Sequence, residues 1–122
     1  MPEVPVPEAA ASLPEALVDA RMVWMTAPSE AVALALVRAL VSERLAACGT
    51  LIPGARSVYR WQGAVQDEPE VLIVLKTQAE LVPALTARAL ELHPYEVPEV
   101  LSVAVADGSC AYLRWIAEST GS

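Results

Sequence analysis

The sequence predicts an α+β fold, with a four-stranded antiparallel sheet, helices on one face and a long central hairpin. The prediction depends on the order of its apolar segments, which alternate as strand, helix, strand, strand, helix, strand and a last helix. Two split βαβ units in tandem produce this order, and their arrangement is the ferredoxin-like fold, βαββαβ plus a C-terminal helix. The 122 residues suffice for one such domain and are too few for two.

The first half of the domain is expected to hold a strand, a helix and the first arm of the hairpin. An apolar strand at 22–27 precedes a helix at 28–47, for which Ser29 is a suitable N-cap. A strand then runs over 48–61. The dipeptide Pro53-Gly54 lies within it and predicts a bulge or bend rather than the end of the strand.

The second arm of the hairpin is expected at 70–77, after a turn at 62–69. The turn contains Gly63, and the acidic residues Asp67, Glu68 and Glu70 are expected to cluster at this tip, where a solvated turn is favoured over a cation site. The five residues 71–75 are all apolar, so this strand is predicted to lie centrally and to be buried on both faces.

The second half of the domain continues with a helix at 78–93 and a strand at 97–106. Pro83 is disfavoured inside a helix but accepted at its first position, so the helix proper is expected to begin there after a turn. Pro94 ends the helix, because a proline disfavours helical geometry in the residue before it. A last helix is expected at 109–119.

The first 21 residues differ from the rest in composition. They hold four of the ten prolines, no aromatic residue, and four acidic side chains against one arginine. Such a segment has little to bury. We therefore expect a flexible tail at 1–21, a domain at 22–119 and a short C-terminal end at 120–122.

Composition also restricts the partners. Fifteen acidic against eight basic residues give a net charge of −7, which disfavours nucleic acid as a partner. The longest apolar run is seven residues, 31–37, whereas a membrane helix needs about 18, so no membrane insertion is expected. Because 55% of the residues are hydrophobic and only 19% are charged, we expect other subunits to cover part of the surface.

The two cysteines, Cys48 and Cys110, are far apart, and the first residues contain no basic segment followed by an apolar one, as a secretory signal would. Reduced thiols and a cytoplasmic location are therefore expected. Cys48 is interpreted first as a small buried hydrophobe. The alternative is a nucleophile, for which His93 is the only histidine that could serve as base.

The stretch HPYEVPEV at 93–100 holds the only histidine and is the best candidate for a ligand site. His93 ends a helix, so its imidazole either satisfies the helix terminus or contacts a metal. Glu96 and Glu99 are candidates for cation contact or acid–base chemistry. One histidine and two cysteines do not make a closed four-ligand zinc site within one chain, and we rank a structural role first.

Aromatic and basic residues alternate at Tyr59, Arg60 and Trp61. In an acidic chain this pattern favours packing across a subunit interface over stacking on bases. No base, nucleophile and orienting group can be named together, so a binding or assembly protein is favoured over an enzyme. A small hydrolase using Cys48 or Glu99 is the least favoured alternative.

Six ordered blocks of the sequence resemble the CutA divalent-cation tolerance proteins. Together they cover essentially all of 22–119. The blocks are TAPSE (26–30), ERLAAC (43–48), LIPGARSVYRWQG (51–63), EVLIVLKT (70–77), HPYEVPEV (93–100) and YLRWI (112–116).

The resemblance implies a ferredoxin-like protomer in a tight homotrimer, in which the hairpin at about 46–77 extends the sheet of a neighbouring subunit. It also implies a cytoplasmic role in divalent-cation tolerance, with weak binding of copper or another divalent cation and no catalysis. The likeness of this family to PII-type signalling trimers leaves one alternative. In that alternative a regulatory trimer binds a small metabolite or an unidentified partner protein in the cleft between subunits.

The copper ligands proposed for the family are partly present in this sequence. Some members have a cysteine before TAP and a histidine before HPY, where this chain has Met25 and Leu92. Met25 offers a thioether that suits Cu(I). The resemblance therefore gives five candidate metal ligands: His93, Met25, Cys48, Glu96 and Glu99.

Overall fold

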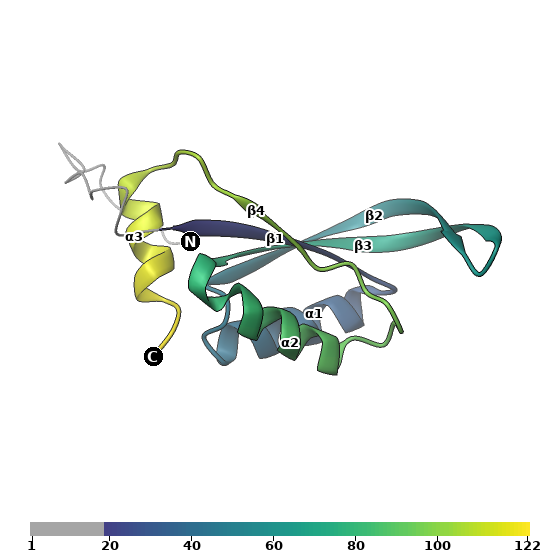
Figure 1. The fold of residues 1–122 in the computed structure, drawn as a ribbon, viewed down its shortest axis with the longest axis horizontal. Helices are drawn as coiled ribbons and strands as arrows, with labels where there is room; N and C mark the ends of the chain where they lie inside the picture. The colour runs from purple at the N-terminus through teal and green to yellow at the C-terminus, as the bar shows by residue number, and fades with distance from the viewer. Residues whose placement is uncertain (1–18) are drawn as a thin grey trace.

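The four strands form one antiparallel sheet, and two helices cover one of its faces (Figure 1). The computed structural model describes residues 19–122. The sheet order is β2-β3-β1-β4, which confirms the ferredoxin-like arrangement. The elements in chain order are β1 (Ala20–Ala27), α1 (Glu30–Ser42), β2 (Cys48–Trp61), β3 (Ala64–Gln78), the 3₁₀ turn η2 (Ala79–Leu81), α2 (Val82–Leu92), β4 (Leu101–Ala104) and α3 (Cys110–Glu118).

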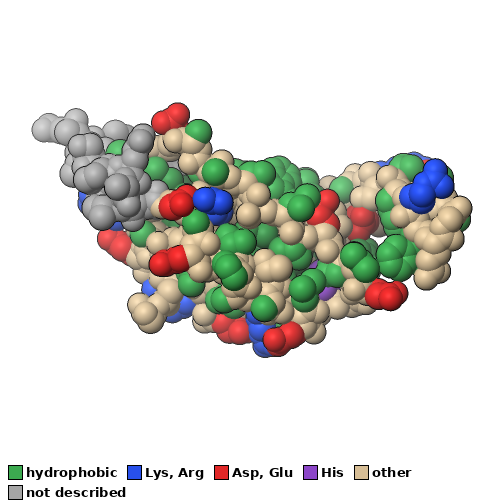
Figure 2. Space-filling view, in the orientation of Figure 1, with side chains coloured by type: hydrophobic (Ala, Val, Ile, Leu, Met, Phe, Trp, Pro, Cys, Tyr) green, Lys and Arg blue, Asp and Glu red, His purple; other side chains and the backbone are tan. Residues whose placement is uncertain are grey.

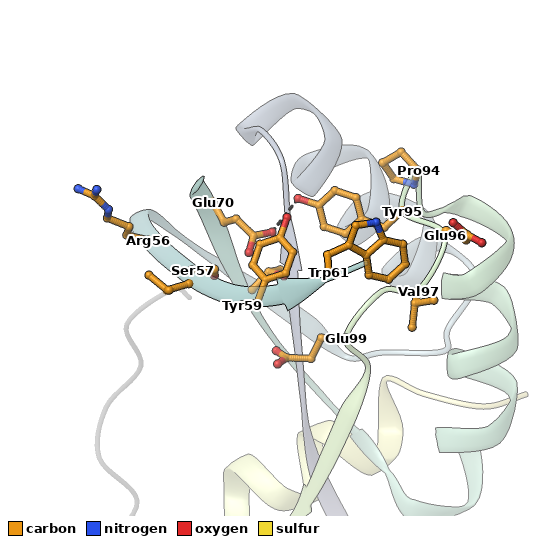
Figure 3. A pocket seen from close by; sticks show the side chains of 12 residues that line it. Arg56, Ser57, Tyr59, Trp61, Glu70, Pro94, Tyr95, Glu96, Val97 and Glu99 are labelled. Atoms are coloured by element: carbon orange, nitrogen blue, oxygen red, sulfur yellow. Dashed lines mark hydrogen bonds between the residues drawn. The ribbon is translucent and has the colours of Figure 1, made fainter. Parts of the chain in front are cut away.

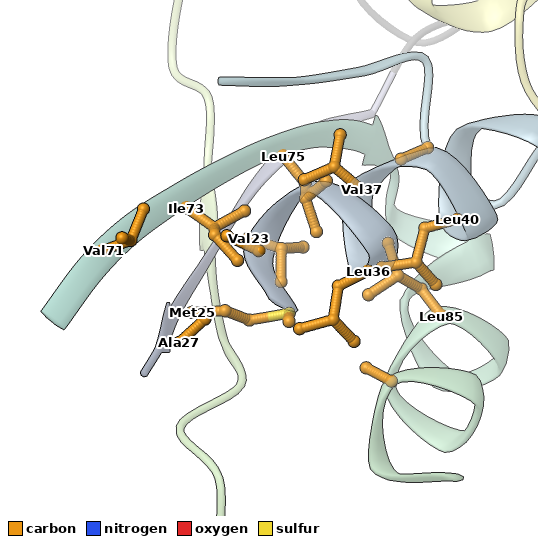
Figure 4. Close-up of a cluster of buried hydrophobic side chains, with 13 residues drawn as sticks. Val23, Met25, Ala27, Leu36, Val37, Leu40, Val71, Ile73, Leu75 and Leu85 are labelled. Carbon is orange, nitrogen blue, oxygen red and sulfur yellow. The ribbon is translucent and has the colours of Figure 1, made fainter. Parts of the chain in front are cut away.

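The hydrophobic core lies between the sheet and the helices α1 and α2 (Figure 4). Alternate residues of β1 and β3 point into it, as the two-residue period of a strand requires. Each large side chain buried here stabilises the fold by about 1.5–3 kcal/mol. The core side chains with no more than 2% of their surface exposed include Val23, Met25, Leu36, Leu40, Ile73, Leu75 and Leu85.

The first strand begins earlier than the sequence predicted. β1 starts at Ala20, which pairs with Gln78 of β3, and the Ala79 amide donates a 2.7 Å hydrogen bond to the Asp19 carbonyl. The expected tail at 1–21 therefore extends too far by these residues, because the pairing with β3 continues to the end of that strand. The rest of the predicted tail, 1–18, lies outside the described residues.

The hairpin turn is much shorter than predicted. Only Gln62 and Gly63 connect the two strands, both with positive φ (49° and 81°), as a tight two-residue hairpin turn requires. The predicted turn at 62–69 is thus wrong beyond Gly63. Asp67, Glu68 and Glu70 lie in β3 rather than at the tip.

A bulge lies where the sequence predicted one. Ile52 pairs with Leu72, but the next paired residues are Ala55 and Glu70, so Pro53 and Gly54 together face one residue of β3. Gly54 has a φ of 84°, which residues with a side chain rarely adopt. The bulge marks the base of the protruding part of the hairpin.

Three other boundaries differ from the predicted ones. α1 ends at Ser42 instead of residue 47, and Arg44 has a left-handed φ of 61°. β4 covers only Leu101–Ala104 of the predicted 97–106, because β1 pairs with β4 no further than Trp24 and Leu101. α2 and α3 lie close to their predicted positions.

The C-terminal residues are bound to the domain. Thr120 is 4% exposed and accepts a 2.7 Å hydrogen bond from Gln78 Nε2. The Arg44 guanidinium donates to the carbonyls of Glu118 and Gly121, at 2.8 and 2.7 Å. Thr120 and Gly121 of the C-terminal end are therefore held against the domain.

Strands β2 and β3 continue beyond β1 as a two-stranded extension of the sheet, residues 55–70, which we call the arm (Figure 1). Two-stranded ribbons are marginally stable alone in water. Val58 and Val65 of the arm are 65% and 63% exposed, and Leu101 of the edge strand β4 is 60% exposed. Figure 2 shows hydrophobic side chains at the surface of both the arm and the sheet.

Within residues 19–122, no helix is long and apolar enough to cross a membrane.

Candidate ligand cleft

A cleft of about 810 Å³ lies at the base of the arm, beside the segment that follows α2 (Figure 3). This volume is in the range of small-molecule sites, about 300–1,000 Å³. Four parts of the chain form its walls: the end of β1, β2 and β3 of the arm, and residues 94–99. The lining residues are Thr26, Arg56, Ser57, Val58, Tyr59, Trp61, Glu70, Pro94, Tyr95, Glu96, Val97 and Glu99.

Three aromatic side chains line the cleft (Figure 3). Tyr59 and Trp61 are two residues apart on β2, so the pleat of the strand places them on one face. Tyr59 Oη donates a 3.1 Å hydrogen bond to Glu68, which lies on the same face of β3. Tyr95 comes from the segment after α2 and completes the aromatic wall.

Glu70 is the buried carboxylate of the cleft. It is only 8% exposed, and its Oε2 accepts a 2.7 Å hydrogen bond from Tyr95 Oη. Among residues 19–122, no other side-chain hydrogen bond reaches this carboxylate, which leaves Oε1 available to a ligand. Burial, and then the hydrogen bond to Glu70, raises the pKa of Tyr95 well above its ordinary value of 10.0, so its phenol remains a donor.

His93 positions the wall of the cleft rather than facing a ligand. Its Nε2 lies 2.8 Å from the Thr26 carbonyl, which only accepts hydrogen bonds, so Nε2 carries the proton. Its Nδ1 accepts a 3.1 Å hydrogen bond from the Tyr95 amide. Both ring nitrogens are thus engaged in a side chain that is 7% exposed, and neither has a lone pair free for a metal.

The imidazole of His93 also does not satisfy the carbonyls at the end of α2. Only the His93 amide takes part in the helix, through a 2.8 Å bond to the Ala89 carbonyl. The ring instead joins β1 to the segment after α2 and packs against Tyr95, with ring centroids 4.7 Å apart. His93 therefore has a structural role, as predicted, but its ring bonds the Thr26 carbonyl of β1 instead of the end of α2.

Two other candidate ligands lie elsewhere. Met25 is fully buried in the core. Cys48 Sγ lies 3.4 Å from Tyr112 Oη of α3. Cys48 pairs with Lys76 of β3, whereas Thr26, the partner of His93, pairs with Leu72. Four strand residues, about 13 Å, separate these positions, so no Cys48–His93 pair forms.

The five candidate ligands from the sequence are therefore divided. Glu96 and Glu99 line the cleft, and His93 lies behind its wall. In the part of the chain that the structure describes, no three His, Cys, Asp or Glu residues are grouped to hold a metal ion. The structure thus brings only the two glutamates of the set together.

Sequence reasoning missed Glu70 and Tyr95. In the sequence, Glu70 groups with the acidic residues that are predicted to form a solvated hairpin tip. Tyr95 was noted within 93–100 but given no role. Their contact joins residues 25 positions apart, and no local pattern encodes it.

Comparison with known proteins agrees with the fold and the sequence blocks. The family model described as CutA1 divalent ion tolerance protein matches residues 21–119. The chain belongs to this family.

Curated relatives carry the CutA name at high identity. The divalent-cation tolerance protein CutA of Thermus thermophilus is 47% identical over 100 residues, which cover 82% of this chain and 97% of the relative. Human protein CutA is 46% identical over 99 residues, which cover 81% of this chain. Only 55% of the human protein is matched, so the chain spans about half of that relative's length.

Solved CutA structures have the same fold. The CutA structure from Xylella fastidiosa superposes with a TM-score of 0.82 at 42% identity, over 84% of this chain and 99% of that one. The CutA1 structure from Oryza sativa gives a TM-score of 0.83 at 38% identity, over 85% and 95%. This CutA chain therefore has the ferredoxin-like fold of its family.

Proposed function

We propose that this CutA protein is a cytoplasmic homotrimer that acts in divalent-cation tolerance, binds copper or another divalent cation weakly, and catalyses no reaction. The observation that carries the proposal is the charge of the cleft. Glu70, Glu96 and Glu99 line it, and its only basic side chain, Arg56, is already bound to Asp67 at 2.7 and 2.9 Å. Carboxylate oxygens that no basic side chain neutralises attract cations.

The trimer is supported by the exposed surfaces of the arm and of β4. The arm has no third strand, and β4 leaves one edge of the sheet unpaired within residues 19–122. Apolar side chains at both places are more than half exposed. Adding the arm of one subunit to the sheet of the next covers both, which follows the usual way proteins protect strand edges.

Weak cation binding follows from the geometry of the ligands. His93 has no free lone pair, and Glu96 and Glu99 are exposed, so water competes for each cation–carboxylate contact. A reducing cytoplasm is consistent with Cys48 and Cys110, both of which are free thiols.

Calorimetry with Cu²⁺ tests the proposal. The double variant Glu96→Gln/Glu99→Gln should lose most of the binding heat of the wild type. The matched control Glu80→Gln/Glu91→Gln removes the same charge from exposed positions outside the cleft and should behave as the wild type. Identical isotherms for wild type and the cleft double variant contradict the proposed site.

The size of the cleft favours a second function, a PII-like regulatory trimer that binds a small metabolite. The cleft has a volume of about 810 Å³ and is lined by three aromatic side chains, which is more space than a metal ion needs. A bound ligand raises stability by about 2.7 kcal/mol at 100 times its dissociation constant, so a thermal-shift screen of metabolites tests this function. Absence of any shift contradicts it.

A further inference from the structure

The cleft is lined by a largely buried carboxylate, Glu70, that has one oxygen without a protein partner among residues 19–122. Glu70 is 92% buried, and its Oε2 is fixed by Tyr95 Oη at 2.7 Å. Its Oε1 has no hydrogen bond from a side chain within residues 19–122, although Glu70 lines the cleft (Figure 3). Among residues 19–122 no side-chain oxygen is both fully buried and without a partner, so Oε1 is accessible and can accept a hydrogen bond from a donor that enters the cleft.

The charges around Glu70 select a cation. Glu96 and Glu99 add two more carboxylates to the lining. The guanidinium of Arg56 forms two hydrogen bonds with Asp67, and this carboxylate offsets its positive charge. An anionic metabolite meets repulsion here without a free basic partner.

The aromatic lining distinguishes an organic cation from a metal ion. Tyr59, Trp61 and Tyr95 surround the same opening as Glu70 (Figure 3). Aromatic faces attract ammonium groups through cation–π interactions and bind alkyl chains by burial, whereas they offer no ligand atoms to a metal. The phenol groups of the two tyrosines already donate hydrogen bonds within the protein, Tyr59 to Glu68 and Tyr95 to Glu70.

We propose that the cleft binds the primary ammonium group of a small organic amine. The ammonium donates to Glu70 Oε1, and its alkyl chain lies against Tyr59, Trp61 and Tyr95. This inference rests on the second proposed function, since it names the ligand class of a cleft that binds a small molecule. A primary ammonium is favoured over a quaternary one, because only the former has an N–H for Oε1.

Calorimetry of the full-length protein with n-pentylammonium chloride and with 1-pentanol tests the proposal. The two probes have the same chain length, and only the first is charged at pH 7. The ammonium should bind saturably, and pentanol should bind at least about tenfold more weakly. Equal affinities, or no binding of the ammonium, overturn the proposal without any variant.

Variants locate the bound ammonium. Glu70→Gln keeps an oxygen for the Tyr95 hydroxyl but removes the charge, and should weaken pentylammonium binding about tenfold or more. Glu80→Gln, the same change on exposed η2, should leave the affinity unchanged. An unchanged affinity in a folded Glu70→Gln variant overturns the assignment.

Two further measurements separate this inference from its alternatives. Nα-acetyl-L-lysine N-methylamide presents the same ammonium on a protein-like side chain, and tighter binding of this probe than of pentylammonium overturns the small-amine assignment in favour of a lysine from a partner. A Cu²⁺ titration is run on the same samples. Cu²⁺ binding that persists without amine binding overturns only the inference and leaves the cation-tolerance proposal in place.

Discussion

Tyr95 Oη donates a 2.7 Å hydrogen bond to Glu70 Oε2 and thereby joins the segment after α2 to the base of the arm. The same tyrosine donates its backbone amide to His93 Nδ1, and His93 Nε2 donates to the Thr26 carbonyl. A continuous series of hydrogen bonds thus runs from β1 through the helix end to the carboxylate of the cleft. The predictions on Tyr95 and His93 test whether this series fixes the cleft.

Tyr95→Phe should destabilise the protein by about 1–3 kcal/mol, because it leaves the buried Glu70 carboxylate without its donor. Urea unfolding of wild type and variant measures the difference. Tyr59→Phe removes a longer bond, 3.1 Å, from an exposed tyrosine and should change stability by less than about 0.5 kcal/mol. Equal losses of unfolding free energy in the two variants would show that the hydrogen bond from Tyr95 to Glu70 does not contribute the expected stability.

His93→Ala should also destabilise the protein by about 1–3 kcal/mol, since it removes two part-buried hydrogen bonds and leaves the Thr26 carbonyl and the Tyr95 amide without these partners. His93→Gln retains a donor for Thr26 and should lose less. Long-range ¹H–¹⁵N NMR of the imidazole should show the neutral ring with its proton on Nε2. A proton on Nδ1 contradicts the hydrogen-bond assignment.

Cu²⁺ affinity should be nearly independent of His93, because neither ring nitrogen has a free lone pair. We expect His93→Gln to bind Cu²⁺ within about threefold of the wild type, whereas loss of even an outer-shell partner of a metal ligand costs about 10–100-fold. Calorimetry on the folded variant measures this. Complete loss of binding would restore His93 as a ligand.

Tyr112 should ionise late on alkaline titration. Burial, followed by the hydrogen bond with Cys48, raises its pKa to about 12 from the ordinary 10.0. A folded pKa above the unfolded one means that the phenol stabilises the fold fully below pH 10, and that this contribution is lost as the pH rises from 10 to 12. The ultraviolet titration of tyrosinate in wild type and Tyr112→Phe checks it, and a difference spectrum with a midpoint near pH 10 would be inconsistent with burial.

Gly49→Ala should destabilise the protein by about 1–3 kcal/mol. An added Cβ would lie 2.7 Å from side-chain atoms of both Leu75 and Val37, so these buried side chains, or the elements that carry them, must shift. Gly108→Ala is the matched control, since its Cβ would meet Leu113 no closer than 3.4 Å. Thermal melts of both variants measure the difference, and equal melting temperatures would contradict the close packing of β2 on α1.

The sequence predicted the helices and strands well where the pattern is local. The apolar run of β1 and Pro83 in the first turn of α2 depend only on neighbouring residues. The second strand of the hairpin was predicted to begin too late, at residue 70, because residues 64–69, AVQDEP, lack apolar alternation. Their pairing is stabilised across the ribbon instead, as by Arg56 and Asp67, eleven positions apart.

The candidate site was only partly predictable, for the same reason. Position in the sequence correctly placed His93 at a helix end, but the ring partner is Thr26, 67 residues earlier. The two glutamates of the loop were found because they lie near the histidine. Glu70 and the aromatic wall required the three-dimensional meeting of the arm with residues 94–99.

The exposed valines of the arm should control assembly. Val58 and Val65 lie on one face of the ribbon, and the double variant Val58→Asp/Val65→Asp places charge where we expect a neighbouring subunit. It should be monomeric in size-exclusion chromatography. Leu34→Asp, at an exposed position of α1, should leave the assembly intact.

The mass of the wild-type protein in solution tests the central claim most directly. Multi-angle light scattering should give three times the 12.9 kDa of one chain, at micromolar concentration and without added metal. A well-folded species with the mass of a single chain would contradict the account, because the arm would then be stable without a neighbouring sheet.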